Sequence, residues 1–277
     1  MSKGIFQLPV MKNEPVKSYA PGTPERAALK QKLAELNSKD IDLPMIIAGK
    51  EVRTGNLKDI RPPHNHRHLL GHYHQGDKTH VQMAIDAALN AKPGWEAMHW
   101  ESRAAIFLKA AELIAGPYRY EFNAVTMIGQ SKNAYQSEID AVCELIDFYR
   151  FNVKNMDEIY RMQPNSSPGI WNRMVWRPLE GFIFALTPFN FTSIAGNLPG
   201  APALMGNTVV WKPSKTAIYS AHLIMKVLQE AGLPDGVINM VYTDGRDAAD
   251  VIFHHLCRPA LYRFHRSIQQ HVANDCG

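Results

Sequence analysis

The chain has 277 residues, of which 45% are hydrophobic and 20% charged, so it can bury a sizeable core and is not expected to be disordered. A net charge of +4, without a stripe of Lys and Arg interleaved with aromatic residues, argues against nucleic-acid binding. No apolar run approaches a membrane span, the N-terminal residues lack the apolar core of a secretion signal, and the three cysteines suit a reducing compartment, so we expect a cytoplasmic protein without membrane partners.

The first 44 residues are predicted to form an extended arm and a helix. Prolines interrupt residues 1–22, and Thr23-Pro24 has the pattern of a helix N-cap followed by proline at the first helical position. Leucines at helical spacing follow. Residues 45–52 are then predicted to form a hairpin that turns near Gly49.

Six histidines between residues 64 and 80 raise the question of a metal site. Their period-two spacing in a predicted strand places His64, His66 and His68 on one face without completing a tetrahedral set of ligands. We therefore expect a solvated strand face and no metal.

A helical region is predicted from about residue 77 to residue 157. Alanine-rich segments cover residues 81–90 and 102–115, and Gly116-Pro117 ends the second of them. A longer amphipathic helix is predicted over residues 134–156, with carboxylates placed among apolar neighbours.

The pattern changes at residue 180, where short apolar runs begin to alternate with helices. The runs cover residues 181–186, 209–211 and 237–242, and helices are predicted near residues 193–205 and 217–231. Continuous apolar strands that alternate with helices are typical of a parallel sheet covered on both faces. The sequence therefore predicts an α/β fold, in which the arm and helices lead into an incomplete Rossmann-like sheet within residues 45–255.

Two loops at the predicted carboxyl ends of strands carry residues with chemical potential. Open α/β sheets bind their ligands at this edge. Asn190, in the loop after the first strand, can offer its amide to a developing oxyanion, although an ordinary turn asparagine is the simpler interpretation of that residue alone. Lys212, at the end of the next strand, suits the ribose hydroxyls or phosphates of a nucleotide, although by itself it is more simply a surface lysine.

Taken together, the segments 187–191 and 206–214 resemble the aldehyde dehydrogenase superfamily, and within it the Δ1-pyrroline-5-carboxylate dehydrogenases. The resemblance extends up to about His255. Further matching segments are residues 13–16, 22–26, 106–111, 127–132, 144–148, 179–182 and 196–207.

The resemblance implies NAD as cofactor. Lys212 matches the position that binds the adenosine ribose, and Thr187 matches a position in contact with the cofactor. Pro188, Phe189 and Ser214 belong to the same two segments and are expected beside it. Intact members of the family are expected to be homo-oligomers.

The resemblance also implies the oxidation of L-glutamate 5-semialdehyde to glutamate. In that reaction a cysteine thiolate attacks the aldehyde, NAD accepts a hydride, and a glutamate activates the water that hydrolyses the thioester. Asn190 matches the residue that stabilises the oxyanion. Glu144 and Phe191 match positions that line the substrate site, although Glu144 could also be a helix-surface charge. Cys143 does not match the nucleophile and is expected to be a small buried hydrophobic residue.

Residues 256–277 depart from the family pattern. When Leu256 to Ile268 are back-translated with permitted codons and read one nucleotide later, they give Phe-Ala-Gly-Leu-His-Phe-Thr-Gly-Ser-Thr-Gly-Val-Phe, which resembles the segment that the family has here. We therefore expect a frameshifted tail and an N-terminal fragment that lacks the catalytic domain and turnover. Two alternatives are a non-catalytic dinucleotide-binding or subunit-interaction remnant, and a different enzyme of the same superfamily.

Overall fold

The computed structural model describes residues 7–255, so the tail predicted for residues 256–277 lies outside the described residues. The helices are α1 (Pro24–Asn37), α2 (Lys78–Ala97), α3 (Trp100–Ala115), α4 (Arg119–Gln130), α5 (Ala134–Ser137), π-helix η1 (Glu138–Cys143), α6 (Glu144–Arg161), α7 (Thr192–Leu204), 3₁₀-helix η2 (Lys215–Ala217) and α8 (Ile218–Ala231), followed by a helix over 245–255. The strands are β1 (Ile41–Leu43), β2 (Met45–Ile47), β3 (Lys50–Val52), β4 (Leu57–Ile60), β5 (Gly71–His74), β6 (Ile183–Leu186), β7 (Val209–Lys212) and β8 (Ile238–Met240).

The larger sheet has the order β3-β2-β8-β7-β6. Strands β6, β7 and β8 are parallel, which confirms the three strands predicted after residue 180. The predicted hairpin is also confirmed, because β2 and β3 pair in antiparallel fashion from Met45 opposite Val52. The sequence did not predict that this hairpin joins the parallel strands, with Ile46 of β2 opposite Met240 of β8.

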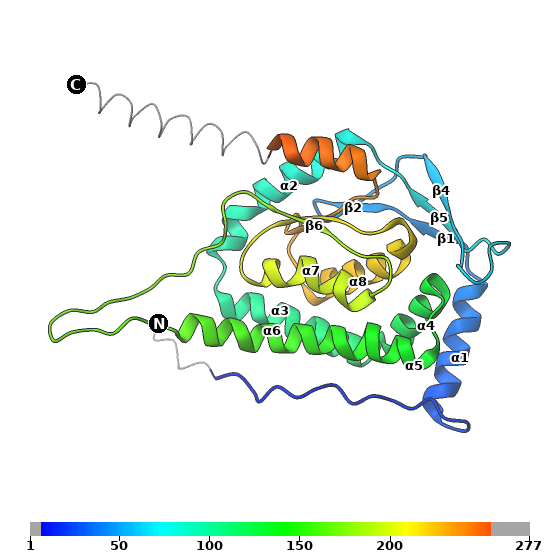
Figure 1. Ribbon diagram of the computed structural model, residues 1–277, viewed down its shortest axis with the longest axis horizontal. Helices are drawn as coiled ribbons and strands as arrows, with labels where there is room; N and C mark the ends of the chain where they lie inside the picture. The colour runs from blue at the N-terminus through cyan, green and yellow to red at the C-terminus, as the bar shows by residue number, and fades with distance from the viewer. Residues whose placement is uncertain (1–6, 256–277) are drawn as a thin grey trace.

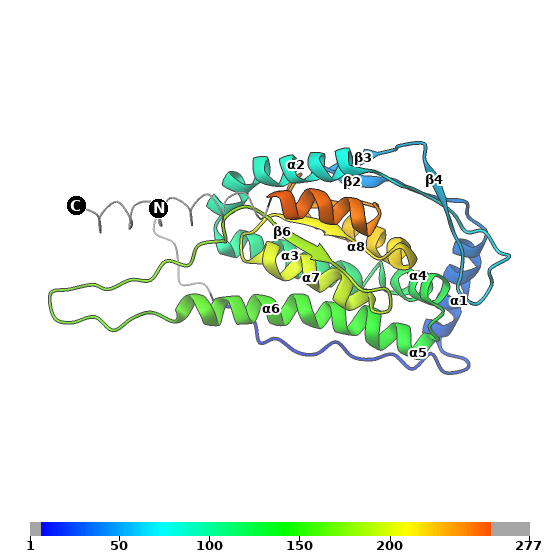
Figure 2. The same ribbon diagram turned by 45° about the horizontal axis from the view of Figure 1, so that its top comes forward.

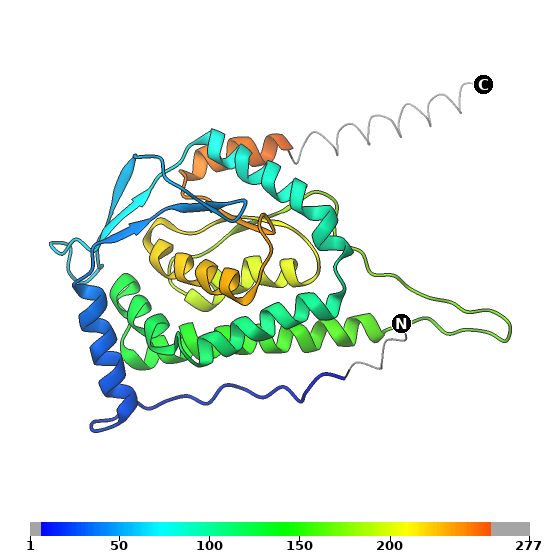
Figure 3. The same cartoon turned by 180° about the vertical axis from the view of Figure 1, so that it is seen from behind.

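The helices lie in layers on the two faces of this sheet. Helix α2 and the helix over 245–255 lie on one side, while α7 and α8 cover the other, where α3 and α6 form a further layer (Figures 1 and 2). The view from behind shows the same succession (Figure 3). This burial explains why the interior strand β7 is apolar from Val209 to Trp211 and buried along its length.

Local sequence signals set several helix ends, and the start of α1 and the end of α3 lie where the sequence predicts them. The Thr23 hydroxyl accepts a hydrogen bond from the backbone N–H of Arg26, and Pro24 takes the first position of α1. Gly116 caps α3, and Gly232 caps α8 in the left-handed conformation with φ of 105°.

The histidine-rich segment differs from its prediction. His64, His66 and His68 lie in a loop, and only residues Gly71–His74 form a strand, β5, in a small sheet of order β1-β5-β4. The expected strand face is therefore wrong, because consecutive turns over residues 63–67 interrupt the alternation, although His64 and His66 are exposed as expected. Among residues 7–255 no group of three or more His, Cys, Asp or Glu side chains is arranged to hold a metal ion.

The long helix predicted over residues 134–156 is present, but its winding changes along the way. It begins as α5, widens into the π-helix η1 and continues as α6 to Arg161. A π-turn within a helix is uncommon and often marks a functional region. None of the helices within the described residues is long and apolar enough to cross a membrane.

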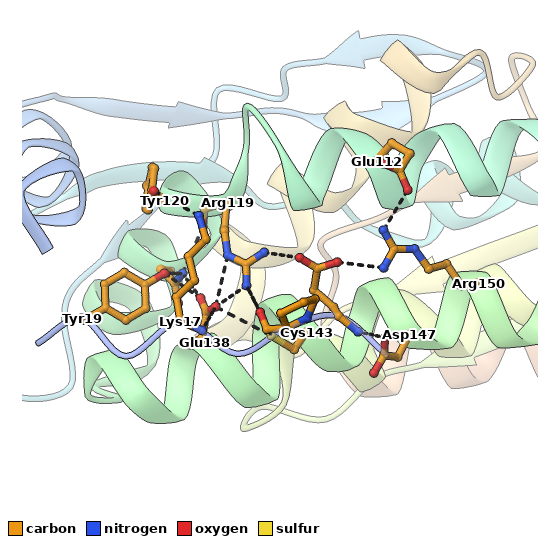
Figure 4. Close-up of polar contacts among 12 residues, drawn as sticks. Lys17, Tyr19, Glu112, Arg119, Tyr120, Glu138, Cys143, Asp147 and Arg150 are labelled. Carbon is orange, nitrogen blue, oxygen red and sulfur yellow. Dashed lines mark hydrogen bonds and ion pairs between the residues drawn. The ribbon is translucent and has the colours of Figure 1, made fainter. Parts of the chain in front are cut away.

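The N-terminal arm runs in extended form beside α6 before α1 begins (Figure 1). Arg119 of α4, which is 1% exposed, holds it: the guanidinium binds the carboxylates of Glu14 and Glu138 and donates to the carbonyl of Pro15 at 2.8 Å (Figure 4). The hydroxyl of Tyr19 also donates to Glu138, at 2.6 Å.

Candidate functional site

The carboxyl ends of β6 and β7 bring the two sequence motifs together. Leu186 is opposite Lys212 in the parallel register, and the backbone N–H of Thr187 donates to the Lys212 carbonyl at 3.2 Å. The indole N–H of Trp211 donates to the Thr187 hydroxyl at 3.0 Å and so fixes that buried side chain. Thr187 and Lys212 therefore lie side by side at the edge where open α/β sheets bind ligands.

The Lys212 side chain is buried without a partner in the described part of the chain. The residue is only 6% exposed, and its ammonium makes no hydrogen bond or ion pair with residues 7–255. Burial lowers the pKa of Lys212, the neighbouring charge of Lys215 lowers it further, and Asp244 opposes both. A cation on a largely buried side chain gains from a ligand that brings hydrogen-bond acceptors.

The loop between β6 and α7 holds the other residues of the first motif. Pro188 is half-buried, whereas Phe189 is 64% exposed and Asn190 is exposed too. In the second motif Ser214 is half-buried, and its hydroxyl lies 3.3 Å from that of Thr216. Pro188, Phe189, Asn190 and Ser214 are thus open to a ligand from outside.

Glu144 and Phe191 both lie near the start of α7. The Ser193 hydroxyl donates to the Glu144 carboxylate at 2.5 Å, and no cation pairs with that carboxylate among the described residues. The Lys132 ammonium lies 4.3 Å from the centre of the Phe191 ring and pairs with Asp140 at 2.7 Å. An uncompensated carboxylate and an aromatic ring thus lie close to the loop that carries Asn190.

The carboxyl end of β8 contributes groups that the sequence reasoning missed. Thr243 is 2% exposed, and its hydroxyl oxygen has no partner within residues 7–255. Asp244 pairs with Lys215 of η2 and accepts a hydrogen bond from the amide of Gln75 at 3.0 Å. Their place at the site could have been predicted from the sequence, because they follow the third parallel strand and that strand ends at the same edge of the sheet.

Cys143 is buried as expected, but its surroundings are polar. Its sulfur lies 3.6 Å from the Arg119 guanidinium and 3.7 Å from the Glu138 carboxylate. Burial, reinforced by the negative charge of Glu138, raises the pKa of the Cys143 thiol to about 12. Such a thiol is not a nucleophile at neutral pH.

The fold and the site define an α/β protein with a ligand edge formed by its parallel strands, and the comparison with known families agrees. The model of the aldehyde dehydrogenase family matches residues 51–258, so the chain belongs to that family.

Among curated relatives, the chain is similar to a Δ1-pyrroline-5-carboxylate dehydrogenase of Agaricus bisporus, with 54% identity over 85% of this chain and 44% of the relative. A probable Δ1-pyrroline-5-carboxylate dehydrogenase of Schizosaccharomyces pombe is 48% identical over 90% of this chain and 46% of the relative. The chain thus spans somewhat less than half the length of these relatives.

The solved structures agree with the sequence matches. The Δ1-pyrroline-5-carboxylate dehydrogenase of Mycobacterium tuberculosis, in a structure bound with NAD and cobalamin, has a TM-score of 0.89 and 52% identity over 91% of this chain and 47% of its own. A mutant of the Thermus thermophilus 1-pyrroline-5-carboxylate dehydrogenase has a TM-score of 0.81 and 26% identity over 88% of this chain and 48% of its own.

Proposed function

We propose that this chain supplies the NAD-binding edge and part of the substrate site of a Δ1-pyrroline-5-carboxylate dehydrogenase, which oxidises L-glutamate 5-semialdehyde to glutamate. The observation that carries the proposal is the meeting of Thr187 and Lys212, from two separate family motifs, at the carboxyl edge of the parallel sheet. The names of the relatives and the NAD in a solved relative support it.

The residues at this edge fit a dinucleotide. The ammonium of the buried residue Lys212 has no acceptor in the described part of the chain, and ribose hydroxyls or phosphates supply acceptors. The exposed faces of Phe189 and the half-buried Pro188 and Ser214 provide further contact surface. When bound, NAD supplies the hydride acceptor of the oxidation. Residues 45–255 then form part of the NAD-binding domain, after the arm and first helix of residues 1–44.

Asn190 is proposed to stabilise the negative charge that develops on the aldehyde oxygen when a thiolate adds to the carbon. Its exposed side chain carries amide N–H groups, and the adjoining start of α7 fixes the loop that presents it. Donors that are already in place lower the barrier because they need no reorganisation as the charge develops.

Glu144 and Phe191 are proposed to hold the rest of the substrate. The Glu144 carboxylate has a hydroxyl partner, Ser193, but no cationic one among residues 7–255, so its charge is available to the substrate's ammonium group. The Lys132 ammonium covers the Phe191 ring and keeps it in place as a wall of the site.

NAD binding to purified residues 1–277, measured by calorimetry, tests the cofactor part. We expect saturable binding, and Lys212→Met should raise the dissociation constant by about tenfold or more, because a hydrogen bond to a charged group contributes about 1.5–3 kcal/mol. Lys226→Met is the matched control, since Lys226 lies over the Tyr118 ring. A chain that is folded by circular dichroism but does not bind NAD would contradict the proposal, and so would equal effects of the two substitutions.

Residues 1–277 on their own are proposed to bind without turnover. Within the described residues the one thiol is that of Cys143, whose high pKa and burial keep it unreactive. Incubation with glutamate semialdehyde and NAD should give no NADH above the blank, and measurable turnover would refute this part. Sequencing of the gene from the codons for Tyr242 to beyond Gly277 tests the proposed frameshift, which a frame that cannot be restored to the family pattern would exclude.

We also propose that the protein is located in the cytoplasm and that intact subunits form a homo-oligomer. Relatives from Emericella nidulans and Bos taurus are named as mitochondrial, and the matrix shares the reducing conditions of the cytosol. Fractionation of cells that express the tagged protein separates the two compartments, and recovery with mitochondria would replace the cytoplasmic assignment.

A further inference from the structure

The end of α4 lies against the start of α7. Gln130 is the last residue of α4, and its side-chain amide donates to the Thr192 hydroxyl at 3.0 Å. Two residues later, the Lys132 ammonium lies over the Phe191 ring. Phe191 and Thr192 are the two residues that follow Asn190 directly. The end of α4 therefore contacts both residues that connect the Asn190 loop to α7.

The start of α7 depends on such contacts because it lacks a cap of its own. Phe191 occupies the N-cap position, and its side chain makes no capping hydrogen bond. A Ser, Thr, Asp or Asn at this position usually supplies that bond and stabilises the first turn of the helix. Here Thr192 is 0% exposed, and its hydroxyl lies 3.1 Å from the Thr126 hydroxyl of α4 as well as accepting from Gln130. Hydrogen bonds from another helix thus hold the first turn of α7.

The Gln130 amide also contacts the start of α8. It donates to the Ser220 hydroxyl at 3.0 Å, and that hydroxyl in turn donates to the Ala217 carbonyl of η2 at 3.1 Å. Because the Ser220 proton is directed to Ala217, the Ser220 oxygen receives its other hydrogen bond from the amide nitrogen of Gln130. The amide oxygen of Gln130 is buried and has no hydrogen-bond partner within residues 7–255. Gln130 therefore acts as a donor that joins the first turns of the two helices that follow the two family motifs.

We propose that Gln130 is a positioning residue for Asn190, because it holds the first turn of α7 and with it the loop that presents the Asn190 amide. The inference rests on the proposed function, since it explains how the residue that stabilises the oxyanion is kept in place. A donor lowers the barrier most when it is held before the charge develops. Gln130 needs no contact with substrate or cofactor for this role, since it acts through Thr192.

Nuclear magnetic resonance of the isotope-labelled chain tests the inference at two places. Backbone order parameters of Asn190 and Phe191 report on the loop. Hydrogen exchange of the Ala195 N–H, which donates to the Phe191 carbonyl at 3.0 Å, reports on the first turn of α7. Gln130→Met should lower the order parameters from about 0.85 to below about 0.6 and speed the Ala195 exchange by about tenfold. The Met205 N–H, which donates to a carbonyl at the other end of α7, should keep its exchange rate.

Two substitutions of Thr192 separate hydrogen bonding from packing. Thr192→Val keeps the shape of the side chain but removes the hydroxyl, so it should reproduce the effects of Gln130→Met. Thr192→Ser keeps the hydroxyl and removes a buried methyl group, so its order parameters and Ala195 exchange should stay within about twofold of the wild type. Gln229→Met is the matched control and should change neither signal, because the half-buried Gln229 amide donates to the distant Gly49 carbonyl at 3.1 Å.

The outcomes separate this inference from the proposed function. Equal effects of Thr192→Val and Thr192→Ser would overturn the inference, because they would show packing in place of a hydrogen bond. Faster exchange of Ala195 and Met205 alike would also overturn it, because it would show a loss of overall stability. NAD binding by a chain whose loop does not respond to Gln130→Met would leave the proposed function standing without the inference. The expected loop response in a chain that does not bind NAD would leave Gln130 as the residue that holds the loop, and the cofactor part of the proposed function would fail. If Gln130→Met does not fold, the two Thr192 variants decide.

Discussion

Replacement of Arg119 by methionine should destabilise the fold more than any surface substitution, because Arg119 neutralises a fully buried carboxylate. Glu138 is 0% exposed, and Arg119 binds it through Nε at 3.1 Å and again through Nη2. Asn123 and Tyr19 donate to the other Glu138 oxygen, at 2.8 Å and 2.6 Å, but neither carries a compensating charge.

The expected loss of stability follows from the Glu138 carboxylate that stays buried when Arg119 is removed. Removing one partner of a buried ion pair costs about 3–5 kcal/mol, since the remaining charge is left without compensation. Glu14 contributes less to the loss, because Arg150 still binds its carboxylate at 2.8 Å. Urea unfolding followed by far-ultraviolet circular dichroism should therefore give a free energy of unfolding lower by about 3–5 kcal/mol at pH 7.5.

The pH dependence gives the sharper test, because between pH 7.5 and pH 5 Glu138 should change the stability of the variant but not that of the wild type. In the wild type burial acts to raise the pKa of Glu138, but hydrogen bonds from Arg119, Tyr19 and Asn123 outweigh it and hold the pKa below its usual value. A carboxyl whose pKa is lowered by folding adds stability above its unfolded pKa of about 4.3, and this stability is lost as the pH falls through the folded pKa.

Without Arg119, burial leaves Glu138 with a raised pKa, and the folded variant gains relative stability when the carboxyl takes up a proton. The difference in the free energy of unfolding between wild type and Arg119→Met should thus become smaller as the pH falls from 7.5 to 5. Glu138→Gln in the Arg119→Met background is the control and should remove most of that pH dependence. A loss below about 1 kcal/mol, or a difference that is equal at both pH values, would refute the reasoning.

Three further predictions concern stability and are measured by thermal unfolding. Gly71→Ala should lower the free energy of unfolding by more than about 2 kcal/mol, because Gly71 has φ of 146° and an added Cβ would lie 2.0 Å from the Ile41 carbonyl oxygen. An unchanged midpoint of unfolding would contradict the close approach of β1 and β5. Burial lowers the pKa of His222 to about 4. The contribution of His222 to stability is therefore full above its unfolded pKa of about 6.5 and is lost as the pH falls towards 4. His222→Asn should lessen the fall in the unfolding midpoint over that pH range. Thr23→Ala should cost about 1 kcal/mol through loss of the α1 cap, whereas Thr23→Ser should cost little.

The alternation of strands and helices after residue 180 could be predicted because each element carries its own local signal. An apolar run such as residues 209–211 needs cover on both faces whatever its partners are, and Gly232 ends α8 through its own backbone conformation. The pairing of β2 with β8 could not be predicted in this way. It joins Ile46 to Met240, and nothing local in either strand specifies a partner so distant in sequence.

The candidate site was partly predictable for the same reason. Thr187 and Lys212 follow two predicted strands, and the carboxyl ends of parallel strands share one edge, so their proximity could be inferred. The ion pair of Lys215 with Asp244 joins two loops, which spacing alone does not reveal. The burial of Glu138 was equally hidden, because the arm that covers it lies more than a hundred residues earlier in the chain.

The helical segment from Ala134 to Arg161 connects the arm with the site, because some of its carboxylates bind the arm and another lies at the site. Glu138 binds Arg119 and the arm, and Asp147 accepts hydrogen bonds from Asn13 and from the backbone of the arm (Figure 4). Asp140 pairs with Lys132. Each of these charges is engaged in holding structure. Glu144, by contrast, has a neutral hydroxyl as its partner among the described residues, and it faces α7 beside the Asn190 loop. The arm thus binds carboxylates on the other side of this segment. Glu144 remains as the carboxylate whose charge is available to a ligand.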